Sequence, residues 1–306
     1  MIGIHAYWSQ PTLTGTSGHH LEGVSEFSMY DFEIVHFLLS ALYYKKLNGP
    51  IHLYTDPTFY KYLEERDLLH FWDKVDKDTY TIFAKQNIDS STNWTGFKTW
   101  LLGQLQPPFL LLDHDNLIYT KIPEELFDIP VRFAHMEKIN PFYYPSRDRM
   151  DVKDFVYNED WDWSLNIANT CMLYFNDKDF IKEYAEKAME FERNNSSDDE
   201  YLAEVQYLFA DQRLPVMMLE EKGIEYDSFS NLIFSPIGKD IPNWETITED
   251  PLKDCVGFDH TWAFKHTLKK DKKAYKEYMD RHLKMILSDF RGYKKYFKQF
   301  YDSKQL

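Results

Sequence analysis

The amino-acid sequence predicts an α/β fold, in which helices flank a mostly parallel open sheet and a C-terminal helical extension follows. Short apolar segments alternate with helical patterns along the first half of the chain. Residues 109–112 are four consecutive apolar residues, which is typical of a strand buried on both faces of a parallel sheet. With 306 residues and 43% hydrophobic content, the chain is long enough to bury a core. We expect one main domain over residues 1–265 and a basic, aromatic helical extension packed on it over residues 266–306.

The N-terminal part reads as strand, helix, strand, helix. IGIHAYW is the first strand, and a polar, glycine-containing loop follows at residues 9–20. A helix is expected from Ser28, with Asp31 completing a capping box, and Asn48-Gly49-Pro50 ends it. IHLYT is the second strand, and Asp56 is expected to cap the next helix.

The central part continues the alternation. A helix is expected over residues 94–105, and Pro107-Pro108 ends it directly before the strand FLLL. VRFAHM and IANTCMLYF are further strands, and helices are expected over residues 177–193 and 198–212.

Charge and cysteine content exclude several classes of partner and site. The formal net charge of -15 disfavours binding to nucleic acid. Cys171 and Cys255 have no metal-type spacing and cannot build a disulfide framework, which indicates a reducing compartment. There is no signal-peptide pattern and no apolar stretch of about 18 residues, so we expect a cytoplasmic protein. The basic C-terminal segment leaves open a peripheral contact with the inner face of an anionic membrane, and packing against the sheet is the alternative.

Two acidic residues, Asp113 and Asp115, follow the buried strand in the segment FLLLDHDNLIY. Ligands of open α/β sheets bind at the carboxyl ends of the strands, where both carboxylates would project to one side. Carboxylate oxygens suit Mg²⁺ or Mn²⁺, and Mg²⁺ needs only one or two of them when phosphate oxygens complete its shell. The alternative is that DHDN forms an ordinary turn.

This combination resembles the GT-A glycosyltransferases, in which an apolar run precedes a DxD motif. The sequence is most similar to bacterial glycosyltransferase-like proteins linked to surface polysaccharide synthesis. The similar segments are IGIHAYW, YDFEIVHFLLSALYYKK, IHLYTD, FKTWLLGQLQPPFLLLDHDN, NTCMLYF and FDHTWAFK. The resemblance implies a Rossmann-like sheet, a metal bound by Asp113 and Asp115, and a contact of Asp113 with the sugar or ribose.

The resemblance also implies roles for residues distant in the sequence. The segment from His260 to Lys265 is similar to an element of glycosyltransferase family 8, in which a histidine completes the metal site and a lysine meets the diphosphate. Here that element lacks the family's glycine and is one residue shorter. Lys98 is expected near the nucleotide, with a solvated position on the helix surface as the alternative. His5 and Tyr7 are expected beneath the base or ribose of the nucleotide, with a place in the core as the alternative for both rings.

The reacting centre is expected to involve four further residues. By resemblance, Asn169 would contact the donor or acceptor sugar. Glu204, Asp211 and Gln212 lie where related enzymes place a carboxylate or amide close to the anomeric carbon. If Glu204 or Asp211 is the general base, burial should raise its pKa toward neutrality. A solvated helix face is the alternative for both.

The predicted function is therefore the metal-dependent transfer of a sugar from a nucleoside-diphosphate sugar to a glycan or lipid-linked acceptor. Two alternatives remain at this point. A sugar-phosphate nucleotidyltransferase normally needs a basic, glycine-rich loop after the first strand, and residues 9–20 contain no Lys or Arg. A non-catalytic carbohydrate-binding protein could retain the same fold.

Overall fold

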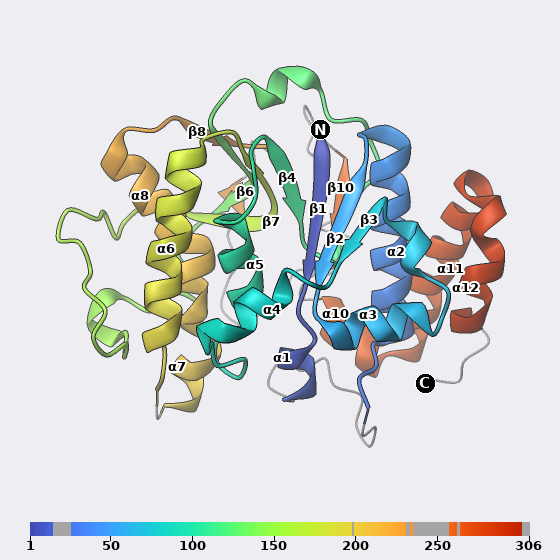
Figure 1. Ribbon diagram of the computed structural model, residues 1–306, viewed down its shortest axis with the longest axis horizontal. Coiled ribbons are helices and arrows are strands. Elements are labelled where there is room, and N and C mark those ends of the chain that lie inside the picture. Colours follow the sequence, from blue (N-terminus) through green and yellow to red (C-terminus); the bar gives the residue numbers. More distant parts are fainter. Residues whose placement is uncertain (15–25, 198, 231–232, 235–256, 262–263, 302–306) are drawn as a thin grey trace.

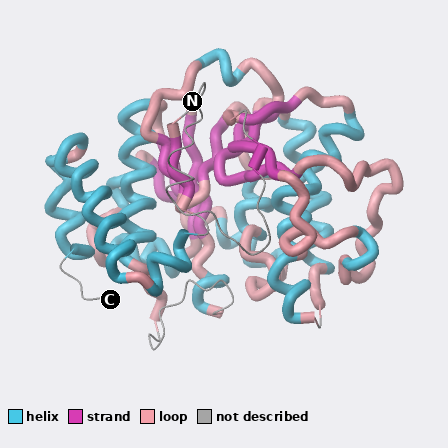
Figure 2. Tube along the Cα trace, turned by 180° about the vertical axis from the view of Figure 1, so that it is seen from behind, coloured by secondary structure: helices cyan, strands magenta, loops and turns pink. Residues whose placement is uncertain are grey.

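A central sheet with helices on both faces forms the body of the computed structural model (Figure 1). The structure describes residues 1–14, 26–197, 199–230, 233–234, 257–261 and 264–301. Seen from behind, in Figure 2, the strands again lie between two groups of helices. Across the described residues, no helix combines the length and apolar character needed to span a bilayer.

The main sheet has eight strands within the described part of the chain. They are β1 (Ile2–Tyr7), β2 (Ile51–Thr55), β3 (Lys74–Asp76), β4 (Phe109–Leu112), β6 (Val131–Glu137), β7 (Ile167–Phe175), β8 (Tyr226–Ser228) and β9 (Ile233–Phe234). Their order is β3-β2-β1-β4-β7-β6-β8, and β9 pairs with β6. Only β7 runs antiparallel to its neighbours among these pairings. The predicted α/β class with a mostly parallel open sheet is confirmed.

The strand order creates a crevice at one edge of the sheet. The chain passes from β1 outward through β2 to β3, and then returns to place β4 on the other side of β1. This reversal is a topological switch point, and ligands of such sheets bind outside the carboxyl ends of the two strands that flank it. Those ends are Tyr7 in β1 and Leu112 in β4, directly before Asp113.

The helices fill both faces of the sheet. The α-helices are α1 (Gln10–Leu13), α2 (Asp31–Leu47), α3 (Pro57–Glu64), α4 (Tyr80–Phe83), α5 (Gly96–Leu102), α6 (Lys178–Asn194), α7 (Glu200–Val205), α8 (Leu214–Lys222), α10 (Phe264–Lys270), α11 (Lys272–Asp289) and α12 (Lys294–Tyr301). A π-helical turn covers Phe209–Arg213, and 3₁₀ turns cover Leu69–Phe71, Ala84–Gln86, Glu124–Phe127, Arg147–Arg149 and Arg291–Tyr293.

Local signals located the start of α3, but the expected helix over residues 198–212 is wrong in extent, since α7 covers only Glu200–Val205 and a π-helical turn covers Phe209–Arg213. Asp56 caps α3 as predicted, because its side chain accepts hydrogen bonds from the backbone N–H groups of Thr58 and Phe59. The expected capping box of Ser28 and Asp31 is wrong, since α2 begins at Asp31 and its N-cap, Tyr30, makes no side-chain cap bond. Helix α2 therefore forms without a polar N-cap, and its burial against the sheet stabilises it instead.

Strand β4 contributes to two hydrophobic clusters, one on each face of the sheet. Leu110 and Leu112 belong to the cluster that contains the buried residues of α2. Phe109 and Leu111 belong to the cluster that contains those of α5, α6 and α8. This explains the unbroken apolar run, because successive side chains of a strand point to opposite faces and both faces are covered here.

The C-terminal helices α11 and α12 pack beside α2 (Figure 1). Ile286, Phe290 and Phe297 are buried there and belong to the same cluster as α2. Asp289 accepts hydrogen bonds from the Tyr43 hydroxyl at 2.7 Å and the Lys46 ammonium group at 2.8 Å. The apolar side of the extension is thus used in packing.

Candidate active site

A second, two-stranded sheet brings the late part of the chain to the acidic pair. Strand β5 (Asn116–Ile118) follows Asp115 directly and pairs antiparallel with β10 (Phe258–His260). In this register His260 lies opposite Asn116. Helix α10 then carries Lys265 to the same place, so residues about 150 positions apart become neighbours.

The ammonium group of Lys98, in α5, lies between two carboxylates. Its Nζ atom is 3.2 Å from Oδ1 of Asp113 and 3.0 Å from Oδ1 of Asp211. It also lies 3.2 Å from the Thr170 hydroxyl, which donates a hydrogen bond to Asp211 Oδ2 at 2.9 Å. Asp211 is buried, so the alternative of a solvated helix face is wrong for this residue.

Asp115 forms a second ion pair. The Nζ atom of Lys265 is 2.7 Å from Asp115 Oδ2 and 3.4 Å from Nε2 of His114. The imidazole of His260 lies on the other side, with Nε2 3.6 Å from Asp115 Oδ1. The side chains of Asp115, Lys265 and His260 are all buried, with exposed fractions of 11%, 9% and 9%.

Burial and charge act in opposite directions on these groups. Burial raises the pKa of Asp113 above its ordinary value, and the nearby Lys98 only partly offsets this effect. Burial acts in the same direction on Asp115, but Lys265 and His260 outweigh it and hold the pKa of Asp115 well below its usual range. Burial lowers the pKa of Lys98 and Lys265, and the carboxylates more than compensate, so both pKa values lie above the ordinary lysine value. Asp115 and the two lysines are therefore charged at neutral pH.

A polar chain lies on the β6–β7 side of Lys98. The Asn169 amide donates a hydrogen bond to Glu137 Oε1 at 2.8 Å. The Tyr144 hydroxyl is 3.0 Å from Glu137 Oε2 and 2.6 Å from Gln212 Oε1. Asn169 and Gln212 are thus linked through Glu137 and Tyr144, two residues that sequence reasoning missed. Glu137 ends a strand as Asp113 follows one, and this strand-end position was the available signal.

The expected metal ligands have suitable chemistry but are paired with lysines. Two carboxylates and an imidazole would fit Mn²⁺ or Mg²⁺ when phosphate oxygens and water complete the shell. In the described residues, however, no group of three or more His, Cys, Asp and Glu side chains is arranged to hold a metal ion. A cation at Asp113 and Asp115 would have to take the place of the ammonium groups that now contact them.

A cavity of about 170 Å³ opens beside Asp113 and Lys98. Its walls come from the end of β1, from α1 and from segments before α5 and after α7. They include Tyr7, Trp8, Pro11, Thr12, Trp94, Thr95 and Tyr207. Tyr7 lines this cavity, and its ring also packs against Phe59 at a centroid distance of 4.1 Å.

Two expected site residues are placed differently or not described. His5 is fully buried, its Nδ1 atom accepts a hydrogen bond from Trp72 Nε1 at 2.9 Å, and its Nε2 atom lies 3.2 Å from the Ser40 hydroxyl. Its predicted contact with the nucleotide is a wrong prediction, because both ring nitrogens are used in the core. The side chain of Glu204 lies outside the described residues.

A protein-family model covers almost the whole chain. The model, described as "Family of unknown function (DUF6734)", matches residues 1–301. The chain belongs to this family. No curated protein sequence matches this DUF6734 chain.

Several solved structures are similar to the DUF6734 chain in fold. Mouse xyloside xylosyltransferase 1 is 13% identical, with a TM-score of 0.39, over 86% of this chain and 97% of that one. The nucleoside-diphosphate-sugar pyrophosphorylase of Vibrio cholerae is 14% identical, with a TM-score of 0.36, over 76% of this chain and 93% of that one. The glycosyltransferase GlyE of Streptococcus pneumoniae is 11% identical, with a TM-score of 0.34, over 75% of this chain and 45% of that one.

Glycosyltransferases are thus among the proteins whose structures this chain resembles. Nucleotidyltransferase folds are among them too. At such identities and TM-scores the likeness says nothing about which molecules the DUF6734 chain binds or transforms. Its chemistry has to be argued from its own residues.

Proposed function

We propose that the protein is a metal-dependent glycosyltransferase that moves a sugar from a nucleoside-diphosphate sugar to a hydroxyl acceptor. The observation that carries the proposal is the pairing of Asp113 with Lys98 and of Asp115 with Lys265 at the β1–β4 switch point, beside a cavity. Acidic and basic groups held together at this edge suit a ligand that brings both a pyrophosphate and a cation.

Each charged group has a role in this proposal. Asp113, Asp115 and His260 would hold Mn²⁺ or Mg²⁺, which when bound supplies Lewis-acid stabilisation of the leaving diphosphate. Lys265 lies within reach of a diphosphate at Asp115, where its ammonium group would offset the negative charge that develops on the leaving group. Lys98 pairs with Asp113 while no cation is bound, and once a cation takes that place Asp211 would still hold the Lys98 ammonium group.

The sugar would lie on the side of Asp211, Gln212 and Asn169. Gln212 and Asn169 are held by the Glu137–Tyr144 link, so their amide groups are oriented before a ligand binds. Asp211 accepts hydrogen bonds from both Lys98 and Thr170. These bonds favour its charged form, so Asp211 is better suited to stabilise a positive charge than to act as a general base. We therefore propose Gln212 as a contact of the reacting sugar and Asp211 as a positioning residue for Lys98.

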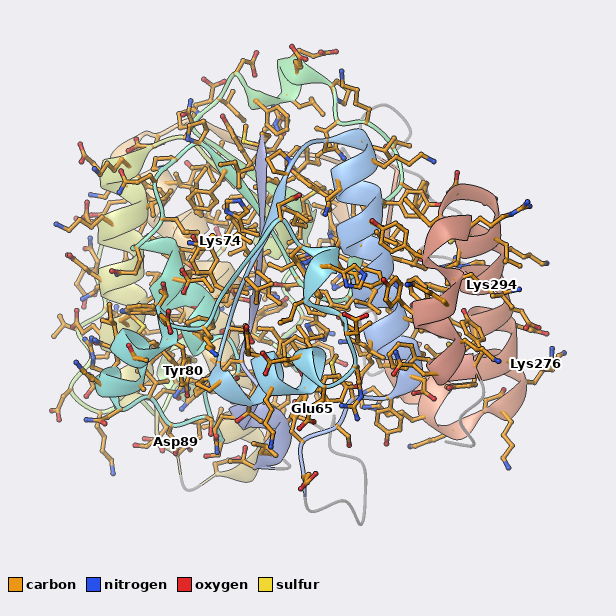
Figure 3. All side chains as sticks on the ribbon, turned by 45° about the vertical axis from the view of Figure 1, so that its right-hand side comes forward. Glu65, Lys74, Tyr80, Asp89, Lys276 and Lys294 are labelled. Carbon is orange, nitrogen blue, oxygen red and sulfur yellow. The ribbon has the colours of Figure 1, made fainter. Side chains whose placement is uncertain are left out.

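The acceptor is proposed to be a glycan or a lipid-linked saccharide of a surface polysaccharide. A lipid-linked acceptor would lie at the inner face of a membrane, and exposed lysines of the C-terminal helices would favour an anionic surface. Figure 3 shows Lys276 and Lys294 on the side of these helices that faces away from the sheet.

Calorimetric titration with nucleotide sugars tests the proposal. The wild-type protein with Mn²⁺ should bind at least one member of a panel of UDP-, GDP-, CDP- and dTDP-sugars. Asp113→Asn and Asp115→Asn should each weaken binding by tenfold or more, since each removes one charged oxygen ligand. Asp289→Asn, at an acidic residue of α11 that does not line the cavity, is the matched control.

Three results would separate the proposed glycosyltransferase from a carbohydrate-binding protein and from a nucleotidyltransferase. Equal binding by the wild type and both site variants would refute the site. Slow release of nucleoside diphosphate in the presence of Mn²⁺ indicates a transferase, because a carbohydrate-binding protein releases none. Release of pyrophosphate from a nucleoside triphosphate and a sugar phosphate would instead identify a nucleotidyltransferase.

A further inference from the structure

Two aromatic side chains at one end of the cavity beside Asp113 belong to neither hydrophobic cluster. Trp94 and Tyr207 both line the cavity, and their ring centroids are 5.3 Å apart with an interplanar angle of 31°. Neither contributes to the two clusters that hold most of the aromatic residues among the described parts of the chain. Core packing therefore does not account for this pair.

The same end of the cavity has polar atoms that lack partners. The indole nitrogen of Trp94 and the hydroxyl of Thr95 are both buried, and neither has a hydrogen-bond partner among the described residues. Thr95 also precedes α5 without capping it through its side chain. Buried donors that stay unpaired are costly, so a ligand hydroxyl group that reached them would supply hydrogen bonds that the described residues do not.

A buried amide network holds the two rings in place. The Asn195 amide donates hydrogen bonds to Asn93 Oδ1 at 2.8 Å and to the Thr92 carbonyl at 3.1 Å. Gln206 donates a hydrogen bond to Asn195 Oδ1. Asn93 and Gln206 directly precede Trp94 and Tyr207, and all three amide residues are buried. The network thus ties together the two segments that carry the rings, as the supporting shell of a preorganised site does.

We infer that Trp94, Thr95 and Tyr207 form a subsite for one sugar ring, next to Lys98 and Asp113. The aromatic faces would pack against the C–H face of a pyranose, and the indole N–H and the hydroxyl would bond its hydroxyl groups. The cavity volume of about 170 Å³ is smaller than the ~300–1,000 Å³ of a typical site for a drug-sized ligand, so it suits one ring of a larger ligand. The inference rests on the proposed function and names residues that determine its sugar specificity.

The ring could come from the donor or from the acceptor, and two titrations distinguish these sources. The first compares each nucleoside diphosphate with its glucose, galactose, mannose and N-acetylglucosamine derivatives, with Mn²⁺ present. The second titrates methyl glycosides of the same sugars into protein that holds the diphosphate. We expect Trp94→Leu to lower the affinity for the sugar-bearing ligand about tenfold in one of the two titrations. The affinity for the nucleoside diphosphate alone should not change.

Two further variants separate stacking from hydrogen bonding and from general damage. Trp94→Phe keeps an aromatic face and removes the N–H donor, so it should lose less affinity than Trp94→Leu. Trp163→Leu is the matched control, because Trp163 is also half-buried with a buried indole nitrogen that has no described partner, but it does not line the cavity. Circular dichroism checks that each variant is folded.

Weakened binding in the first titration assigns the subsite to the donor sugar, and weakened binding in the second assigns it to the acceptor. If Trp94→Leu binds every ligand as the wild type does, while Asp113→Asn still loses the diphosphate, the subsite is refuted and the proposed function stands. If the wild-type protein binds no nucleoside diphosphate, the proposed function itself fails.

Discussion

The ammonium group of Lys98 joins the two acidic residues of the site that come from different elements, Asp113 after β4 and Asp211 in the π-helical turn. A buried cation between two carboxylates makes each group depend on the others, because removing one leaves a charge uncompensated in a poorly solvated place. Glu192, in α6, extends this cluster into the core. It is fully buried, and the neighbouring Thr99 hydroxyl offsets only part of the effect of burial on its pKa.

The pH dependence of stability should report on Glu192. Burial, with a contribution from the Asp211 carboxylate, raises the pKa of Glu192 to about 8 from an ordinary value of 4.5. The folded state therefore retains a proton that the unfolded chain releases above pH 4.5. The free energy of unfolding is therefore highest below pH 4.5. It falls by on the order of 4 kcal/mol as the pH rises to about 8.

Denaturant unfolding at pH 5 and pH 8 checks this expectation. Glu192→Gln cannot ionise, so the variant should gain stability relative to the wild type between these two pH values. Glu190→Gln, on the same helix and more exposed, is the control and should show no such gain. An equal pH dependence in the wild type and Glu192→Gln would show that Glu192 ionises normally.

At the scale of elements, the C-terminal helices are the part whose relation to the sheet matters most. Their apolar residues belong to the same hydrophobic cluster as those of α2, the helix that covers one face of the sheet at β1 and β4. Phe297 of α12 is 1% exposed, and its ring packs edge-on against Phe71 with centroids 5.6 Å apart. This packing indicates that residues 266–301 unfold together with the main domain.

Truncation of one ring in α12 tests this. Phe297→Ala should lower the free energy of unfolding by about 3–5 kcal/mol, because it removes a large buried side chain and leaves a cavity. Lys298→Ala, at the neighbouring exposed position, should change it by less than about 0.5 kcal/mol. A separate early transition in Phe297→Ala, with the rest of the protein unchanged, would instead show that the extension is an independent unit.

At the scale of the whole molecule, charge is distributed unevenly. The chain carries a net charge of -15, while the exposed lysines Lys276 and Lys294 project from α11 and α12 (Figure 3). The apolar side of these helices is buried, so contact with a membrane would be electrostatic and would not require insertion.

Co-sedimentation with lipid vesicles tests this contact. Binding to phosphatidylserine vesicles should exceed binding to phosphatidylcholine vesicles and should fall at high salt. Replacing Lys294 and Lys298 together by alanine should weaken it on the order of 30-fold, since each lysine near an anionic surface contributes ~1 kcal/mol. Lys178 and Lys182, exposed on α6, serve as the control pair. Equal binding by both double variants would locate the contact elsewhere.

The sequence by itself determined the features that depend on neighbouring residues. The run of residues 109–112 predicted a strand buried on both faces, and Asp113 follows its end as expected. Asp56 capped its helix as predicted, because a cap bonds backbone groups two and three residues away. The alternation of strands and helices was sufficient to predict the α/β class.

Only the tertiary structure decided the features that depend on pairing between distant segments. The antiparallel direction of β7 and the β5–β10 pairing that brings His260 to Asp115 follow from long-range contacts that no local pattern encodes. The same holds for the position of Lys98 between two carboxylates. A ring such as that of His5 looks the same in a sequence whether it binds a ligand or completes a core, because burial and hydrogen-bond partners are set by what packs around it.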